Sequence, residues 1–234
     1  MNQTVLITGA NRGLGLELVK VYLKDGFTVF AGVRSSNDHI ERLKQEFPEK
    51  LIDIPMDVSS TESVENAANL LRNQTDHLDI LINNAAVHLE EERKRLEQVD
   101  FDAVLETYNI NTVGSLRVTK YFLPFVEAGN LKLHINISSE AGSIGKCWRD
   151  GEFGYTMSKA ALNMQSVVLQ NLVKPKGIKV LAIHPGWMRT DMGGPNATDS
   201  STTSAEQVAA LGKKYQGDLE APIYFDNHGE VFPY

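Results

Sequence analysis

Short apolar runs alternate with longer amphipathic stretches along most of this chain. Residues 5–8 (VLIT) form a compact run, whereas residues 14–24 repeat apolar positions at the spacing of one helix face. Strands are expected at residues 5–8, 27–33, 51–55, 78–82, 131–138 and 178–183, with a last edge strand at 221–225. Helices are expected at residues 14–24, around 39–47, after the caps Ser59 and Ser60 with Glu62 in the first turn, and, as two long helices, at 99–126 and 153–173.

These elements predict an α/β fold. Strands that are apolar throughout are typical of a parallel sheet covered on both faces. We expect a Rossmann-type doubly wound parallel sheet of about seven strands with helices on both faces. At 234 residues the chain suits a single domain over residues 1–234, because two domains would each have a small core. Ligands bind such sheets beyond the carboxyl ends of the strands, which places the site in the loops after Ile7, Val33, Ile82, Ile137 and Ile183.

Composition and charge narrow the classes of partner. A net charge of −7 and a pI near 5.4 argue against a nucleic-acid-binding surface. The single cysteine, Cys147, cannot form an internal disulfide, and no Cys/His group has metal-site spacing, so no metal is expected. The sequence has no membrane-length apolar run, and its first residues, MNQTVLITGA, lack the basic region of a signal peptide. We expect a cytoplasmic protein with no nucleic-acid or membrane partner.

A glycine-rich turn follows the first expected strand. The segment TGANRGLG, from Thr8 to Gly15, lies between a strand and a helix, where glycines let the backbone approach a pyrophosphate at the helix N-terminus. Glycine-rich turns also occur as plain structural turns, but the strand before and the helix after favour dinucleotide binding. The expected cofactor-binding residues of this loop are Gly9, Asn11, Arg12, Gly13, Leu14 and Gly15.

The end of the second expected strand indicates which dinucleotide binds. NAD-selective sites usually carry an acidic residue there for the ribose 2′-hydroxyl, whereas this strand is followed by Arg34. Arg34 and Arg12 offer two guanidinium groups to a 2′-phosphate, although either alone is often only a solvated surface charge. The pair favours NADP(H) over NAD(H) as cofactor.

Tyr155 and Lys159 are a candidate proton-transfer pair. They lie four residues apart on an expected helix, so the ammonium group can approach the phenol and lower its pKa toward the working range. An ordinary surface pair is the alternative for an isolated Tyr-x-x-x-Lys. Here Ser138 and Ser139 follow an expected central strand, where hydroxyls can polarise a substrate carbonyl or simply form a turn.

Together these motifs resemble the short-chain dehydrogenase/reductase family of the non-extended type. The resemblance runs from Thr4 to about Met192. Ala86 stands where the family usually has glycine, and the interval from Ser139 to Tyr155 exceeds the family's commonest spacing, so an extra loop is expected at residues 146–154. The residues that carry the resemblance are the glycine loop, Asp57-Val58, Asn83-Asn84-Ala85-Ala86, Asn111, Ser139, Tyr155, Lys159 and Pro185-Gly186.

The resemblance implies a role for each matching residue. Ser139 would hold the substrate oxygen, Tyr155 would exchange its proton, and Lys159 would bind the nicotinamide ribose and lower the Tyr155 pKa. Ser138 is the less favoured hydroxyl, and Asn111 would anchor a water in the proton relay. The implied cofactor contacts are Asp57 and Val58 to the adenine, Asn84 and Ala85 to a ribose, and Pro185, Gly186, Met188 and Thr190 to the nicotinamide carboxamide, besides Tyr155 and Lys159.

Residues 184–194 (HPGWMRTDMGG) resemble one branch of the family, the C-factor and sniffer-like carbonyl reductases. The implied activity is NADP(H)-dependent reduction of a ketone, aldehyde or quinone, with Tyr155 as general acid. The alternative is an NADP(H)-binding signalling or sensor protein of the C-factor kind with little turnover. An extended-type sugar-nucleotide epimerase fits poorly, because little chain follows Met192.

Three segments are expected to surround a small carbonyl or alcohol substrate, namely residues 88–98, 143–153 and 187–204. Within the last of these, the Gly/Pro/Ser/Thr-rich residues 193–204 predict either a substrate lid or a disordered surface loop. Trp148 is either a substrate wall or a loop anchor. Because the two long helices often form a four-helix interface in this family, the resemblance also implies a homodimer or homotetramer.

Overall fold

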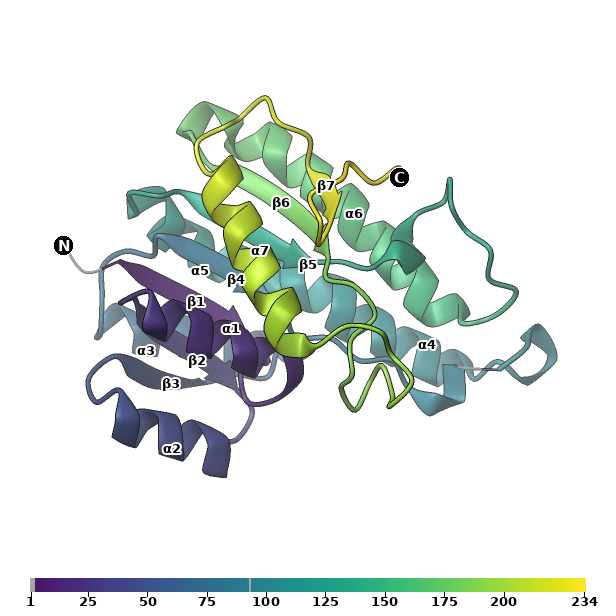
Figure 1. Cartoon of the computed structure of the whole chain (residues 1–234), viewed down its shortest axis with the longest axis horizontal. Coiled ribbons are helices and arrows are strands. Elements are labelled where there is room, and N and C mark those ends of the chain that lie inside the picture. The colour runs from purple at the N-terminus through teal and green to yellow at the C-terminus, as the bar shows by residue number, and fades with distance from the viewer. Residues whose placement is uncertain (1–2, 93) are drawn as a thin grey trace.

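A computed structural model describes residues 3–92 and 94–234, and Figure 1 shows the whole chain. Met1 and Asn2, within the segment expected to lack a signal peptide, and Arg93, within the first expected substrate segment, lie outside the described residues. The described part forms one seven-stranded sheet in the order β3-β2-β1-β4-β5-β6-β7, with every neighbouring pair parallel. The strands are β1 (Thr4–Thr8), β2 (Thr28–Val33), β3 (Leu51–Pro55), β4 (Ile80–Asn83), β5 (Leu133–Ile137), β6 (Lys179–His184) and β7 (Tyr224–Asp226).

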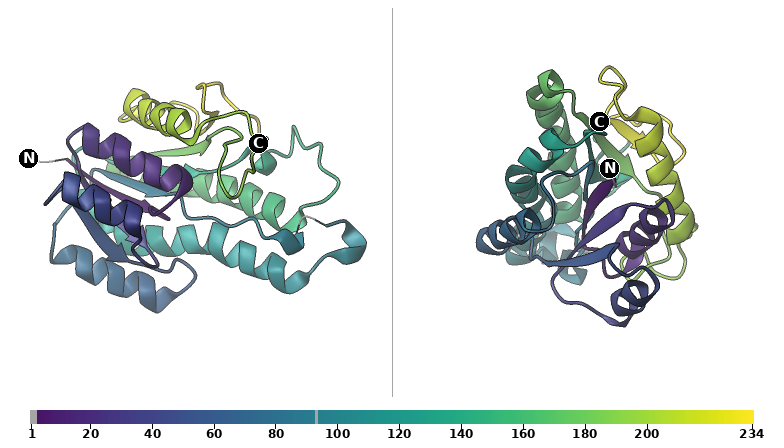
Figure 2. Two further views of the ribbon diagram at one scale, coloured as in Figure 1. Left: turned by 60° about the horizontal axis from the view of Figure 1, so that its bottom comes forward. Right: turned by 90° about the vertical axis from the view of Figure 1, so that its left-hand side faces the viewer.

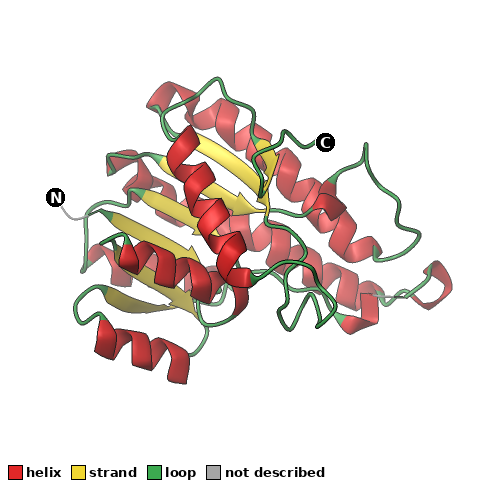
Figure 3. Cartoon of the chain, viewed as in Figure 1, coloured by secondary structure: helices red, strands yellow, loops and turns green. Residues whose placement is uncertain are grey.

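Helices cover both faces of this sheet, as Figure 2 shows in its edge-on view and Figure 3 by the colouring of the elements. On one face lie α1 (Gly13–Lys24), α2 (Asp38–Glu46) and α7 (Ser201–Tyr215). On the other lie α3 (Thr61–Arg72), α5 (Ser115–Ala128) and α6 (Phe153–Val173), with α4 (Phe101–Tyr108) packed against α6. The expected doubly wound, single-domain fold is confirmed. The short 3₁₀ turns are Glu90–Glu92, Leu96–Gln98, Glu140–Gly142 and Lys174–Lys176.

Two hydrophobic cores, one on each face, hold the layers together. Strand β1 contributes to both, because Val5 and Ile7 face one core while Leu6 faces the other. All five residues of β1 are buried, as expected for a central parallel strand with helices on both sides. Strand order reverses between β1 and β4, so the loops that follow these strands border the crevice in which such sheets bind ligands.

The long helix expected at residues 99–126 is not uniform. It begins at Phe101, because the Asp100 carboxylate caps it by accepting hydrogen bonds from the backbone N–H groups of Asp102 and Ala103. A π-helical segment, Asn109–Gly114, then separates α4 from α5. The uniform-helix interpretation was therefore wrong in this segment, because the apolar pattern does not reveal a wider turn.

The Ser/Thr-rich end of residues 193–204 is helical, contrary to the expectation of a loop or lid throughout. The Ser200 hydroxyl accepts a hydrogen bond from the Thr203 N–H and caps α7, so residues 201–204 form its first turn. The edge strand β7 also starts later than expected, at Tyr224. The carbonyls of Ala221 and Pro222 instead accept hydrogen bonds from the buried Lys179 ammonium, at 2.5 and 3.1 Å.

Within the described residues, no helix has an apolar stretch of the length that a bilayer requires. No three His, Cys, Asp or Glu side chains of residues 3–92 and 94–234 gather in the manner of metal ligands.

Candidate active site

The glycine loop joins β1 to α1 and leaves the start of that helix open to an anion. Arg12 stands at the N-cap without a side-chain capping bond, and the first turn of α1 contains no acidic residue. A Cβ added at Gly15 would lie 2.2 Å from the carbonyl oxygen of Gly9, so only glycine permits this close approach. Gly9 adopts φ +63°, in the left-handed region. Free N–H groups, the helix dipole and tight backbone packing fit a pyrophosphate at this helix terminus.

The glycine loop is held against the loop after β4 by Thr8 and Asn84. The Thr8 hydroxyl accepts the backbone N–H groups of Asn84 and Ala85, each at 3.0 Å. The Asn84 amide in turn donates to the carbonyls of Thr8 and Gly9, at 2.8 and 3.2 Å. Asn84 therefore fixes the two loops in register, and its expected contact with the cofactor ribose stays a prediction.

At the other end of this crevice lie the residues expected at the adenosine. The Asp57 carboxylate accepts from the hydroxyl and N–H of Ser59, at 2.7 and 2.9 Å. These hydrogen bonds, aided by the nearby charges of Arg34 and Arg117, lower the Asp57 pKa. Val58 is buried between this loop and the helices beside it. The Asn11 amide donates to the carbonyl of Ser35, which ties the glycine loop to the loop after β2.

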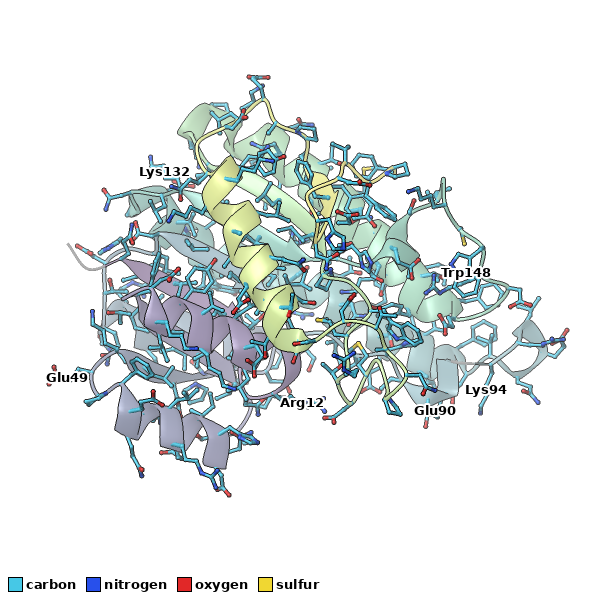
Figure 4. The ribbon with its side chains drawn as sticks, viewed as in Figure 1. Arg12, Glu49, Glu90, Lys94, Lys132 and Trp148 are labelled. Atoms are coloured by element: carbon cyan, nitrogen blue, oxygen red, sulfur yellow. The ribbon has the colours of Figure 1, made fainter. Side chains whose placement is uncertain are left out.

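The two arginines expected at a 2′-phosphate differ in their contacts. Arg34 is exposed and lies near Asp57. Arg12 pairs at 3.0 Å with Asp191, in the segment between β6 and α7, and both side chains are largely exposed. Figure 4 shows Arg12 beside that segment. An exposed pair of this kind is weak and screened by salt, so it leaves the Arg12 guanidinium available to another anion.

Tyr155 lies in the first turns of α6, one helical turn before Lys159. The Lys159 ammonium donates to the carbonyl of Ile137 at 2.8 Å and lies 5.7 Å from the centre of the Tyr155 ring. Burial lowers the pKa of Lys159 to about 8. The structure thus brings the end of β5 and the Tyr-x-x-x-Lys helix together, as the sequence motifs predict.

The expected direction of the Tyr155 pKa was wrong for this structure. Burial raises the pKa of Tyr155, while a hydrogen bond with the Ser139 side chain and the nearby Arg149 charge oppose that rise. The Lys159 ammonium is directed at the Ile137 carbonyl rather than at the phenol oxygen. Ser139 is therefore the hydroxyl that faces Tyr155. Ser138 is buried and donates to the amide oxygen of Asn163 at 2.6 Å.

Asn111 lies in the π-helical segment and is buried. Its amide oxygen accepts the Val87 N–H at 2.8 Å, and its amide nitrogen donates to the Val87 carbonyl at 2.9 Å and to the Ser158 hydroxyl at 3.1 Å. This side chain thus joins the loop after β4 to α6 next to Tyr155. Its expected role as a water anchor stays a prediction.

The segment after β6 folds on itself. Gly186 adopts φ +87°, and a Cβ there would lie 2.2 Å from an Asp199 carboxylate oxygen. The Trp187 indole donates to the carbonyl of Gly193, and the Arg189 guanidinium donates to the carbonyls of Ala197 and Thr198. These bonds give residues 187–199 an ordered shape beside the glycine loop. Met188 and Thr190, expected at the nicotinamide, belong to this segment.

Several residues that surround Tyr155 were not singled out from the sequence. The His88 ring stacks on the Tyr155 ring, with centroids 4.3 Å apart and planes inclined by 19°. The Tyr224 hydroxyl donates to the Ser139 carbonyl at 2.6 Å. Glu140 and Glu152 are joined by Arg149. His88, Arg149 and Glu152 lie in segments that were expected to surround the substrate, and Glu140 directly follows Ser139, but their individual contacts depend on long-range packing.

Residues 3–201 match the family described as short chain dehydrogenase. The chain belongs to this family. The short-chain dehydrogenase assignment expected from the motifs is confirmed, and the protein is an oxidoreductase of that family.

The more specific resemblance to C-factor and sniffer-like proteins is confirmed as well. C-signal of Myxococcus xanthus is 35% identical over 164 residues, which cover 68% of this chain and 95% of C-signal. Carbonyl reductase Sniffer of D. melanogaster superposes with a TM-score of 0.89 at 27% identity over 100% of both chains. The NADPH-bound carbonyl reductase from chicken fatty liver has a TM-score of 0.85 at 29% identity, over 100% of this chain and 94% of that one.

Proposed function

We propose that this short-chain dehydrogenase reduces the carbonyl group of a ketone, aldehyde or quinone with NADP(H), using Tyr155 as general acid. The observation that carries the proposal is the placement of Tyr155, at the start of α6, beside Ser139 after β5 and one helical turn from the buried Lys159, at the carboxyl edge of the sheet. Both hydroxyls can bind one substrate oxygen there. The similarity to Sniffer and to the chicken carbonyl reductase supports this class of reaction.

Each residue of the site has a defined task in this proposal. When bound, the dinucleotide supplies the hydride that the carbonyl carbon receives. Ser139 donates a hydrogen bond to the carbonyl oxygen and holds it within reach of the phenol. Tyr155 gives its proton to that oxygen as the alcohol forms. An ordinary phenol, with a pKa of about 10, carries this proton at neutral pH.

The cofactor preference for NADP(H) over NAD(H) rests on the basic residues around the adenosine end. Strand β2 is followed by Arg34 rather than by a carboxylate, and Arg12 lies in the glycine loop. Guanidinium groups bind phosphate with two parallel hydrogen bonds, whereas a carboxylate at that position would repel it.

A screen of small quinones, diketones and aldehydes against NADPH oxidation tests the function. We expect turnover with at least one of these classes, and slower turnover with NADH at equal concentration. Cofactor binding without turnover on any class would contradict the proposal. It would favour the alternative of a signalling or sensor protein, which the similarity to C-signal supports.

We further propose that the protein is a homodimer or homotetramer. Large apolar side chains are exposed along α4, α5 and α6, where a second copy would cover them. Helices α4 and α6 lie side by side and extend together beyond the sheet (Figure 1). The exposed side chains are Phe101, Leu105, Leu116, Met164, Val168 and Leu172.

A further inference from the structure

Arg149 lies in the extra loop between Ser139 and α6 and makes three hydrogen bonds to two carboxylates. Its two terminal nitrogens donate to both oxygens of Glu140, at 2.8 and 2.5 Å. Its Nε donates to Glu152 at 2.8 Å. The guanidinium stacks on Trp148, whose indole projects outward from this loop (Figure 4). We call this arrangement, formed by Arg149, Glu140 and Glu152, the Arg149 bridge.

The bridge differs from an ordinary surface ion pair. Only 16% of the Arg149 side chain is exposed, against 29% and 30% for Glu140 and Glu152. Two-pronged binding of a carboxylate by an arginine that is largely removed from water fixes geometry more strongly than exposed single contacts do. The bridge therefore holds the backbone segments that carry its two carboxylates.

Those two segments carry the two hydroxyls of the site. Glu140 directly follows Ser139 in the chain, at the start of the 3₁₀ turn after β5. Glu152 precedes α6 with φ +60°, a left-handed conformation that residues other than glycine rarely adopt, and its carbonyl accepts the Thr156 N–H. Tyr155 lies in the turn that this residue opens. A fixed separation between Glu140 and Glu152 thus sets how Ser139 and Tyr155 face each other.

The bridge also changes the charge around the phenol. The groups that face Tyr155 are His88 from the loop after β4, Glu140, Arg149 and Glu152 from the extra loop and its ends, Lys159 from α6, and Tyr224 from β7. The Arg149 charge lowers the pKa of Tyr155, and the charges of Glu140 and Glu152 raise it. Without the arginine, two carboxylates would face the phenol uncompensated.

We propose that Arg149 is a positioning residue for carbonyl reduction, because it bridges Glu140 and Glu152 and so fixes Ser139 and Tyr155 at the separation that one substrate oxygen requires. This inference rests on the proposed function. It assigns to the extra loop a direct part in organising the site, through an arginine that does not touch the reacting atoms.

The test compares Arg149→Met with Arg149→Lys in the full-length protein. We expect Arg149→Met to lower kcat for NADPH-dependent reduction by roughly tenfold or more, with the KM for NADPH within about twofold of wild type. The pKa of Tyr155 rises in this variant, so the phenol stays protonated to higher pH and the alkaline loss of kcat moves upward by roughly one pH unit. Arg149→Lys keeps the positive charge but can bind only one of the two carboxylates at a time. We therefore expect it to restore the pH profile and only part of kcat.

Two further variants distinguish the effect of Arg149 on the positions of Ser139 and Tyr155 from its effect on charge and from a general effect on folding. In Arg149→Met/Glu140→Gln/Glu152→Gln, the uncompensated charges are gone, so the pH profile returns to that of wild type while kcat stays low. Arg72→Met, on the exposed surface of α3, is the matched control and should leave both unchanged. An Arg149→Met enzyme with wild-type kcat and pH profile would overturn the inference, as would full recovery of kcat in the triple variant.

A second measurement tests the role of Arg149 without relying on turnover. The ultraviolet titration of Tyr155, obtained as the difference between each protein and its Tyr155→Phe counterpart, should move to higher pH in Arg149→Met. A wild-type protein that reduces no carbonyl would defeat the proposed function whatever this titration shows. An active wild type whose Tyr155 titration and kcat are both insensitive to Arg149→Met defeats only the inference about Arg149.

Discussion

Three influences act on the pKa of the Tyr155 phenol. Burial raises its pKa, the Ser139 hydroxyl and Arg149 oppose that rise, and two carboxylates reinforce it. Lys159 contacts the Ile137 carbonyl rather than the phenol. The choice of Ser139 over Ser138 was possible from sequence, because Ser139 lies three residues before Gly142, as the family resemblance implies. The segments that carry His88 and Arg149 were expected beside the substrate, but their contacts with Tyr155 were not predictable, since both reach it from other loops.

Replacement of the acid itself gives the first prediction at this scale. Tyr155→Phe removes the proton donor and leaves the ring, so we expect kcat to fall by roughly 10²–10⁴-fold. NADPH binding, followed by the fluorescence of the bound nucleotide, should stay within about twofold of wild type because the glycine loop is untouched. Undiminished turnover would remove Tyr155 from the mechanism.

Tyr224 gives a second prediction. Its buried hydroxyl donates to the Ser139 carbonyl at 2.6 Å, so Tyr224→Phe leaves a buried acceptor without that partner. We expect a loss of about 1–3 kcal/mol in the free energy of unfolding, measured by denaturant titration. The KM for the carbonyl substrate should rise as well, because Ser139 is less well fixed. Unchanged stability and KM would show that this bond has no such role.

At the scale of elements, periodicity predicted most of the helices and strands but not their irregularities. The strands β1 to β6 lie where apolar runs placed them, because buried parallel strands need no polar face. Helix α7 (Ser201–Tyr215) was missed as a whole, because Ser, Thr and Ala dominate its start at residues 200–205, a composition also typical of loops. The π-helical segment at Asn111 was missed because its extra residue is set by contacts to Val87 and α6.

The glycine loop gives a prediction at this scale. In Gly15→Ala the new Cβ would lie 2.2 Å from the Gly9 carbonyl oxygen, so the loop has to move. We expect NADPH affinity, measured by calorimetry, to fall by roughly tenfold or more. Gly26→Ala is the control: nothing lies within 4 Å of its Cβ, although its φ of +86° strains the backbone. It should therefore lower stability without loss of affinity, and equal affinity losses in both variants would contradict the expected role of Gly15.

At the scale of the whole molecule, the helices on one face of the sheet expose large apolar side chains. These side chains lie on α4, α5 and α6. They are distinct from Arg34 and the glycine loop, which border the crevice expected to bind the cofactor. The sequence predicted the long helices that carry this surface from their periodicity. It could not predict how many copies associate, because that depends on the shape of the surface in three dimensions.

The proposed assembly can be tested with charge. Met164→Glu/Val168→Glu places two carboxylates in the exposed apolar face of α6, so we expect the mass measured by light scattering to fall to that of a smaller assembly or a monomer. Leu70→Glu, which changes an exposed leucine on α3, should leave the mass unchanged. A wild-type protein that is monomeric at all concentrations would contradict the proposal.

The π-helical segment has a consequence for the length of the chain itself. Each residue advances an α-helix by about 100°, and a wide turn accommodates one residue more than an α-turn does. Deletion of a single residue between Asn109 and Gly114 would convert this turn to ordinary α-helix and change the direction in which the side chains inside the segment point. Asn111 would then point away from Val87. Evolution or design can therefore alter amino acids in this segment far more easily than it can alter their number.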